Sequence, residues 1–144
     1  MRLTVPRCED LLRQEERATL ATRHPVRGVD AVPACFSYDG SNLAIPVDRV
    51  KPKSGAALQR VANLHTDPRA VLLCDRWDSG DWSRLWWVRA SLEYVVIPTE
   101  LSAELEGLLE AKYRQYEGRP VLDVLVFRVT GLSGWAASAE ASDW

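Results

Sequence analysis

Two lysines separated by one proline precede a predicted helix and could together bind an anion. They are Lys51 and Lys53, within the segment VDRVKPKSGAALQRV at residues 47–61. Ser54 is a favourable N-cap for the helix, and an apolar stripe of helical spacing follows it. Because a helix N-terminus carries positive partial charge, two ammonium groups are unfavourable there unless an anion lies between them. The spacing therefore indicates a phosphate site that combines both lysines with the free N–H groups of the first helical turn.

A solvated basic turn is the alternative interpretation of this loop, and the residues alone do not decide between the two. Neither a Walker sequence nor a G-x-G-x-x-G pattern occurs, so neither nucleotide-binding motif applies. The 144-residue chain has a net charge of -2, which provides no general field for nucleic acid or an anionic membrane. Any anion site must therefore be local.

The cysteines and histidines do not form a metal-binding pattern. The chain has three widely spaced cysteines and only two histidines: Cys8, Cys35, Cys74, His24 and His65. A structural zinc site needs a tighter cluster, so we expect no metal. Cys35 and Cys74 fall in apolar, strand-like runs and are expected to be buried thiols.

Most of the tryptophans are concentrated in one short segment. Four of the six lie within eleven residues, as Trp77, Trp82, Trp86 and Trp87. On a strand, Trp86 and Trp87 point to opposite faces, so one can fill the interior while the other meets a partner or a ligand. A core-plus-dimer role and a stacking role beside a planar ligand both remain open. Arg84 and Arg89 also lie on opposite faces, and spacing assigns a role to neither.

The elements that must position these residues are mostly strands. Six strands are predicted, at residues 19–25, 29–38, 43–47, 69–77, 83–97 and 121–130. Helices are predicted at residues 8–18, after Ser54 and at 100–116. Asp39-Gly40 supplies a hairpin turn. This order predicts one mainly β domain over residues 1–144, an antiparallel barrel with peripheral helices, whose small-residue stretch at 136–142 frays.

Two features of the strands and the N-terminus predict assembly and location. The runs LWWV and VLVFRV show little alternation, whereas a sheet that faces water should alternate apolar and polar residues. We therefore expect a homodimer formed across the barrel walls. The first residues lack the apolar stretch of a signal peptide, and no run approaches a membrane span, so a cytoplasmic location is expected.

The chain resembles a known group of flavoproteins over residues 5–135. The combination of VDAVPACFSYDGSNLAIPVD, KPK, DPRA and DWSRLWWVR is similar to the pyridoxamine-phosphate-oxidase-like (PPOX class) split barrels. More narrowly, it resembles their actinobacterial branch that uses the deazaflavin coenzyme F420. The resemblance implies a six-stranded FMN-binding-type split β-barrel that forms a homodimer, with two cofactor sites at the dimer interface.

The same resemblance assigns cofactor-binding positions in four groups. The family strand whose backbone lines the tricyclic ring is matched by Val32, Pro33, Ala34, Cys35 and Phe36. The strand end beside the cofactor is matched by Pro46, Val47 and Asp48. The basic loop that holds the cofactor phosphate is matched by Lys51 and Lys53. Trp87 falls where the flavin-using oxidases carry a glutamine, and is therefore expected near the cofactor.

Several departures from the oxidases change the expected reaction. Lys51-Pro52-Lys53 stands where the oxidases have Ser-Arg-Lys, and Phe36 takes the approximate place of a substrate-binding lysine. The C-terminal segment that closes the pyridoxal site is missing, and Asp30 replaces a frequent histidine. Pyridoxamine phosphate oxidation is therefore not expected.

The resulting prediction is an F420-dependent oxidoreductase that transfers hydride from reduced F420 to an unsaturated organic acceptor. An FMN-binding oxidoreductase of the same fold is one alternative, and a non-enzymatic protein that binds a flavin or a tetrapyrrole is another. No catalytic residue is assigned; Tyr38, Asp48 and water are equivalent candidates for the proton donor. The sequence does not identify the substrate.

Overall fold

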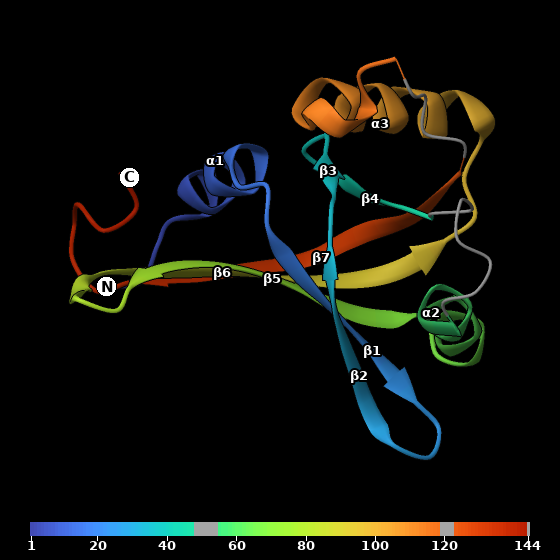
Figure 1. The fold of residues 1–144 in the computed structure, drawn as a ribbon, viewed down its shortest axis with the longest axis horizontal. Coiled ribbons are helices and arrows are strands. Elements are labelled where there is room, and N and C mark those ends of the chain that lie inside the picture. The colour runs from blue at the N-terminus through green and yellow to red at the C-terminus, as the bar shows by residue number, and fades with distance from the viewer. Residues whose placement is uncertain (48–54, 119–122, 144) are drawn as a thin grey trace.

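A computed structural model describes residues 1–47, 55–118 and 123–143. Within these residues, seven strands form one curled antiparallel sheet (Figure 1). The strands are β1 (Ala18–His24), β2 (Gly28–Ala34), β3 (Ser37–Tyr38), β4 (Asn42–Pro46), β5 (Arg69–Asp78), β6 (Asp81–Val95) and β7 (Val124–Ala136). The helices are α1 (Val5–Gln14), α2 (Gly55–Thr66), α3 (Thr99–Lys112) and the short 3-10 helix η1 (Arg114–Tyr116).

The strand order explains why the sheet curls. The order is β2-β1-β5-β6-β7-β4-β3, so β2 and β3 are the two edge strands. Only Cys35 and Phe36 separate them in the chain, which limits the ends of the two edges to a separation of about 10 Å. The two edges must therefore approach each other, and the sheet closes into a half-barrel. The prediction of a mainly β, antiparallel split barrel is confirmed.

The predicted number of strands was wrong, because residues 29–38 form two strands and not one. β2 pairs with β1, whereas β3 pairs with β4 at the other edge of the sheet. The change of partner occurs at Phe36, whose side chain is fully buried. A continuous apolar run contains no turn residue at this point, so its pattern could not reveal the break.

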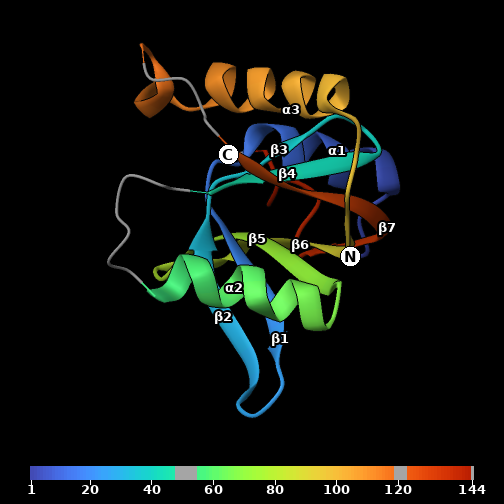
Figure 2. The same cartoon turned by 90° about the vertical axis from the view of Figure 1, so that its right-hand side faces the viewer.

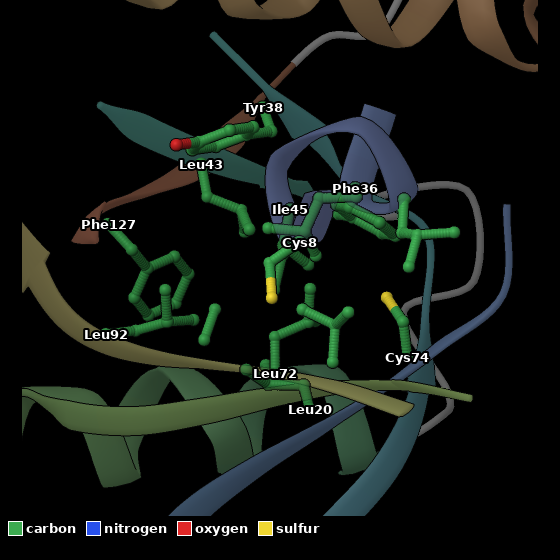
Figure 3. Close-up of a cluster of buried hydrophobic side chains, with 14 of the residues drawn as sticks. Cys8, Leu20, Phe36, Tyr38, Leu43, Ile45, Leu72, Cys74, Leu92 and Phe127 are labelled. Carbon is green, nitrogen blue, oxygen red and sulfur yellow. The ribbon is translucent and has the colours of Figure 1, made fainter. Parts of the chain in front are cut away.

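The main core lies on the concave side of the sheet. Figure 3 shows Leu20 and Leu72 from one half of the sheet facing Leu43 and Phe127 from the other. Trp86 is 1% exposed and belongs to this core, whereas Trp87 lies half-buried on the opposite face. The predicted opposite orientation of the two tryptophans is therefore confirmed.

The three helices cover different parts of the barrel. Figure 2 shows α3 over β3 and β4, while α2 lies across the β1–β2 hairpin. Helix α1 packs against β7 and β3. At Gly134 of β7 an added Cβ atom would lie only 2.8 Å from Sγ of Cys8 on α1. Glycine therefore permits the close approach of α1, and the strand continues beyond residue 130, where it was predicted to end.

Helix α1 begins and ends earlier than predicted. The Thr4 hydroxyl accepts a hydrogen bond from the Arg7 backbone N–H at 3.3 Å, and a proline occupies the first turn. Both are N-terminal signals of a helix. At the other end, the carboxylate of Glu15 accepts hydrogen bonds from the backbone N–H groups of Glu16 and Arg17. These bonds hold the chain in the turn that leads to β1.

Two long-range hydrogen bonds hold the end of α3 and the C-terminal segment in place. Helix α3 stops at Lys112, before the predicted residue 116, and the next side chain, Tyr113, donates to the Glu16 carbonyl at 2.6 Å. Arg7 donates to the Ser142 carbonyl, also at 2.6 Å. Ser142 is 6% exposed, so the small-residue stretch that was predicted to fray is packed against α1.

The buried ion pair between Glu15 and Arg76 gives a stability prediction. Glu15 is 3% exposed, and its Oε2 atom lies 3.0 Å from Nη2 of Arg76. Replacing Arg76 with leucine leaves a buried carboxylate with only its two backbone donors, which should lower the free energy of unfolding by about 2 kcal/mol. The matched control is Arg128→Leu, whose pair with Glu93 is exposed and should contribute less than about 1 kcal/mol. Equal losses for both variants in urea unfolding would contradict the argument.

Candidate functional site

An apolar groove lies on the convex outer face of β5 and β6. It has a volume of about 590 Å³, and we call it the tryptophan groove. Its lining is formed by Leu73, Asp75, Trp77, Trp82, Leu85, Trp87 and Arg89. Trp77 and Trp82 are 54% and 71% exposed, which is unusual for such large apolar side chains. An exposed apolar surface of this kind marks an interface or a ligand site.

Arg89 covers one ring of the groove. Its guanidinium carbon lies 5.4 Å from the ring centroid of Trp87, within the range of a cation–π contact. This assigns a contact to Arg89, whose role could not be predicted from its spacing along the strand. Arg84, on the other face, pairs with Asp78 at 3.4 Å.

A second, more polar cavity lies at the free edge of β2, beside α2. It has a volume of about 500 Å³, and we call it the β2-edge cavity. Its lining is formed by Thr22, Arg27, Val29, Asp30, Ala31, Val32, Gln59 and Arg60. Guanidinium and amide groups predominate among the polar side chains, so the cavity is suited to a polar or anionic group.

A hydrogen-bond network fixes the polar side of this cavity. Arg27 donates through Nε and Nη2 to the two carboxylate oxygens of Asp30, at 3.2 and 3.0 Å. The fully buried Asn63 donates to Asp30 at 2.9 Å and to the Thr22 hydroxyl at 3.0 Å. Gln59 in turn donates to the Asn63 amide oxygen at 2.9 Å. The network joins α2 to the edge of the sheet.

Two hydrogen bonds lower the pKa of Asp30 below its ordinary value. The bond from Arg27 has the larger effect, and the bond from Asn63 has the second largest. Asp30 therefore stays ionised near neutral pH, and its charge is matched by Arg27. In the sequence, Asp30 is distinguished only as the replacement of a histidine that is frequent in related sequences. The one sequence signal for Asn63 is a polar residue between Val61 and Leu64 on the apolar stripe of α2.

The structure places the predicted ring-contacting strand partly in the core. Val32 lines the β2-edge cavity, and Pro33 is exposed on the outer face. Ala34 and Cys35 are half-buried. Phe36 is fully buried, and its backbone N–H donates to the Tyr113 hydroxyl at 3.1 Å. Of this segment, Val32 to Cys35 are accessible to a ligand.

The other predicted positions fall at the end of β4, on β6, and in the loop between β4 and α2. Pro46 and Val47 are half-buried at the end of β4, where the Val47 N–H donates to the Asp123 carbonyl at 3.0 Å. Trp87 lies in the tryptophan groove. Asp48, Lys51 and Lys53 lie outside the described residues.

One chain does not bring Pro33 and Trp87 together. Pro33 pairs with Thr19, Thr19 with Leu73 and Leu73 with Arg89, so the four residues form one row across β2, β1, β5 and β6. Residues paired in register share a face of the sheet. Three strand spacings separate Pro33 from Arg89, which corresponds to about 14 Å. Trp87 lies two residues further along β6, on the same outer face.

In the part of the chain that the structure describes, no group of three or more His, Cys, Asp or Glu side chains could hold a metal ion. No helix there is long and apolar enough to cross a membrane.

Comparison with known proteins identifies the type of fold. No family model matches the chain, and no curated protein matches its sequence. Solved structures do match it along almost its full length, and they identify the curled sheet as a split barrel of the pyridoxamine 5'-phosphate oxidase-like type. This confirms the fold that the sequence resemblance implied.

Three solved structures illustrate the likeness. A FAD-binding protein from Mesorhizobium loti has 16% identity and a TM-score of 0.66, with 93% of each chain covered. A candidate pyridoxamine 5'-phosphate oxidase from Corynebacterium glutamicum has 14% identity and a TM-score of 0.59, with 93% of this chain and 90% of that chain covered. The heme storage protein HutZ from Vibrio cholerae has 14% identity and a TM-score of 0.62, with 89% and 92% covered. At such identities the likeness establishes the fold alone.

Proposed function

We propose that the protein is a cytoplasmic, homodimeric oxidoreductase that binds coenzyme F420 at its dimer interface. The reaction is hydride transfer from reduced F420 to an unsaturated organic acceptor. The observation that carries the proposal is the separation of Pro33 and Trp87 by about 14 Å or more on one outer face. A second copy packed face to face would bring its own Trp87 to the first copy's Pro33. The site is complete only with both copies.

Different residues of the chain would hold different parts of such a cofactor. Val32 to Cys35 would lie against the tricyclic ring, and the tryptophan groove of the second copy would cover it and exclude water. Lys51 and Lys53 would hold the phosphate. The β2-edge cavity, with Gln59 and Arg60 in its wall, would take polar parts of the cofactor beyond the ring. The cofactor itself supplies the hydride.

One of the three candidate proton donors has another role. The Tyr38 hydroxyl lies 3.0 Å from a Glu9 carboxylate oxygen and 2.9 Å from the Gly40 carbonyl, and the side chain is 6% exposed. Burial, followed by the contact with Glu9, raises the pKa of Tyr38 to about 12. The proposal therefore leaves Asp48 and water as proton sources.

The choice between F420 and FMN can be tested by side-by-side titration. F420 continues beyond its phosphate into an acidic lactyl-oligoglutamate tail, whereas FMN ends there. The Lys-Pro-Lys turn, with Arg49 and Arg60 nearby in sequence, favours the longer anion, and Pro52 lacks a backbone donor that an enclosed phosphate would use. We expect tighter binding of F420 than of FMN, with a stronger loss at high salt. Stoichiometric FMN in the purified protein would contradict this choice.

The names of structurally similar proteins support the two alternatives. FAD binding in one of them favours an ordinary flavin, and heme storage in another favours a non-enzymatic binder. The discriminating measurement is turnover: a protein that binds reduced F420 but never oxidises it with quinones or other unsaturated acceptors would be a carrier.

The dimer itself is tested by light scattering. We expect a species of about twice 16.2 kDa at micromolar concentration. The reason is that a second copy packed over the tryptophan groove would remove its exposed apolar side chains from water. Leu73→Glu, in the tryptophan groove, should shift the protein to monomer. The matched control is Leu108→Glu on α3, since the two leucines are 37% and 42% exposed. A wild-type monomer, or equal dissociation of both variants, would refute the interface.

A further inference from the structure

Two opposite charges on the outer face have no partner within the described part of the chain. They are Arg17, the residue before β1, and Asp75 of β5, and both are exposed. Neither side chain forms a hydrogen bond or an ion pair with a described residue. Both line a third cavity of about 530 Å³, together with Arg76 and Trp77. Arg76 already pairs with Glu15, so Arg17 and Asp75 are the unmatched charges of this cavity.

The third cavity adjoins the tryptophan groove, because Asp75 and Trp77 line both. Asp75 is directly opposite Trp87 in the pairing of β5 with β6. It therefore lies within the apolar surface that a second copy covers in the proposed function, on which the present inference rests. A carboxylate that lost its water there without gaining a partner would oppose association. A second copy that covers the groove must therefore bring a cation to Asp75.

The proposed packing determines which residues lie near the two-fold axis of the dimer. In a face-to-face pair of identical chains, the axis that brings the partner's Trp87 to Pro33 passes midway between these two positions. Because β1 and β5 are the strands between β2 and β6, the midpoint falls between β1 and β5. Trp87 is two residues beyond Arg89 in the row that contains Thr19 and Leu73. The midpoint therefore falls about one residue beyond that row.

Arg17 and Asp75 flank this midpoint on opposite sides. Asp75 is two residues beyond Leu73, and Arg17 is two residues before Thr19, which is the same direction because the strands are antiparallel. Rotation about the axis exchanges the two sides. On a flat sheet with about 4.8 Å between strands and about 3.3 Å per residue, the partner's Arg17 falls within about 4 Å of Asp75 in projection, and the partner's Arg89 about 12 Å away.

We propose that Arg17 of each copy forms an ion pair with Asp75 of the other, so that two such pairs flank the axis of the dimer. Because the outer face is convex, two copies approach each other most closely beside the axis, where these side chains lie. An apolar surface alone permits several relative positions of the copies, whereas paired charges select one. The two ion pairs therefore hold the partner's Trp87 opposite Pro33.

Two charge-reversed chains, Asp75→Arg and Arg17→Asp, test this pairing. In a homodimer of either variant, like charges meet at both positions, so the dissociation constant of the dimer should rise at least about ten-fold. In a mixed dimer of the two variants, opposite charges meet at both positions. Within each chain the charges at 17 and 75 remain alike, so recovery on mixing reports contacts between copies and not within one copy.

The full-length variants differ in mass, so native mass spectrometry distinguishes mixed dimers from homodimers, and sedimentation gives their dissociation constants. We expect mixed dimers far above the random share of about one half, with an affinity close to that of the wild type. The matched control is Arg114→Asp, which reverses an exposed charge on η1 and should leave the dissociation constant unchanged.

The outcomes separate this ion pair from the proposed dimer. A dimeric wild type whose two variants dimerise normally, or mix only in the random share, would overturn the ion pair and leave the dimer intact. A dissociation caused equally by Arg114→Asp would overturn it too, because the effect would then be one of net charge. A monomeric wild type would overturn both proposals.

Discussion

The double variant Lys51→Gln/Lys53→Gln is expected to bind F420 at least ten-fold more weakly than the wild type, with its fold intact. Each charge-assisted hydrogen bond to a phosphate contributes about 1.5–3 kcal/mol, so the loss of two should reduce affinity by at least about ten-fold. Of the single variants, Lys53→Gln should have the larger effect, because Lys53 matches the family's terminal basic residue and is nearer the helix start. Fluorescence titration measures the affinity, and circular dichroism reports the fold.

A control must separate this local effect from the loss of two positive charges anywhere on the protein. The variant Arg13→Gln/Arg114→Gln removes two charges from α1 and η1 and should bind F420 as the wild type does. If the lysine variant retains wild-type affinity, the Lys-Pro-Lys segment is a solvated turn. If both variants weaken binding equally, the effect is one of net charge.

Most of the fold could be predicted because the strands are mostly apolar runs and the helices carry apolar residues at helical spacing. The break between β2 and β3 could not, because it depends on a change of strand partner. Residues 31–36 form an unbroken apolar run, and only the three-dimensional arrangement shows that Phe36 turns into the core. The length of β7 was underestimated for a related reason. Gly131 follows the predicted end at residue 130, yet the strand continues to Ala136, and at Gly134 the missing side chain makes room for Cys8.

The site could be predicted only where a residue's neighbours in sequence define its role. The position of Trp87 on the outer face follows from strand alternation, because the neighbouring Trp86 is buried. The contacts of Asn63 do not follow from the sequence, because they are with Thr22 and Asp30, far away in the chain. They depend on which strands tertiary packing places beside α2.

The separation of Pro33 from Trp87 leads to a complementation experiment. If the site combines the loop of one copy with Trp87 of the other, then each single defect impairs both sites of its own homodimer. The two defective chains are Lys51→Gln/Lys53→Gln and Trp87→Leu; leucine keeps an apolar side chain at the interface but removes the aromatic ring. Each homodimer is expected to bind F420 weakly.

Mixing the two chains under conditions of subunit exchange is expected to restore tight binding. A mixed dimer joins the intact loop of the Trp87→Leu chain to the intact Trp87 of the other chain, so one of its two sites is fully native. With equal amounts and random pairing, about half of the dimers are mixed, and about one quarter of all sites should recover wild-type affinity. The titration should therefore show a tight phase of that amplitude, which is absent when either variant is measured alone. If loop and tryptophan acted within the same copy, no mixed dimer would contain a native site. Mixing would then leave binding as weak as in the two homodimers, and the proposal of a site shared between two copies would be wrong.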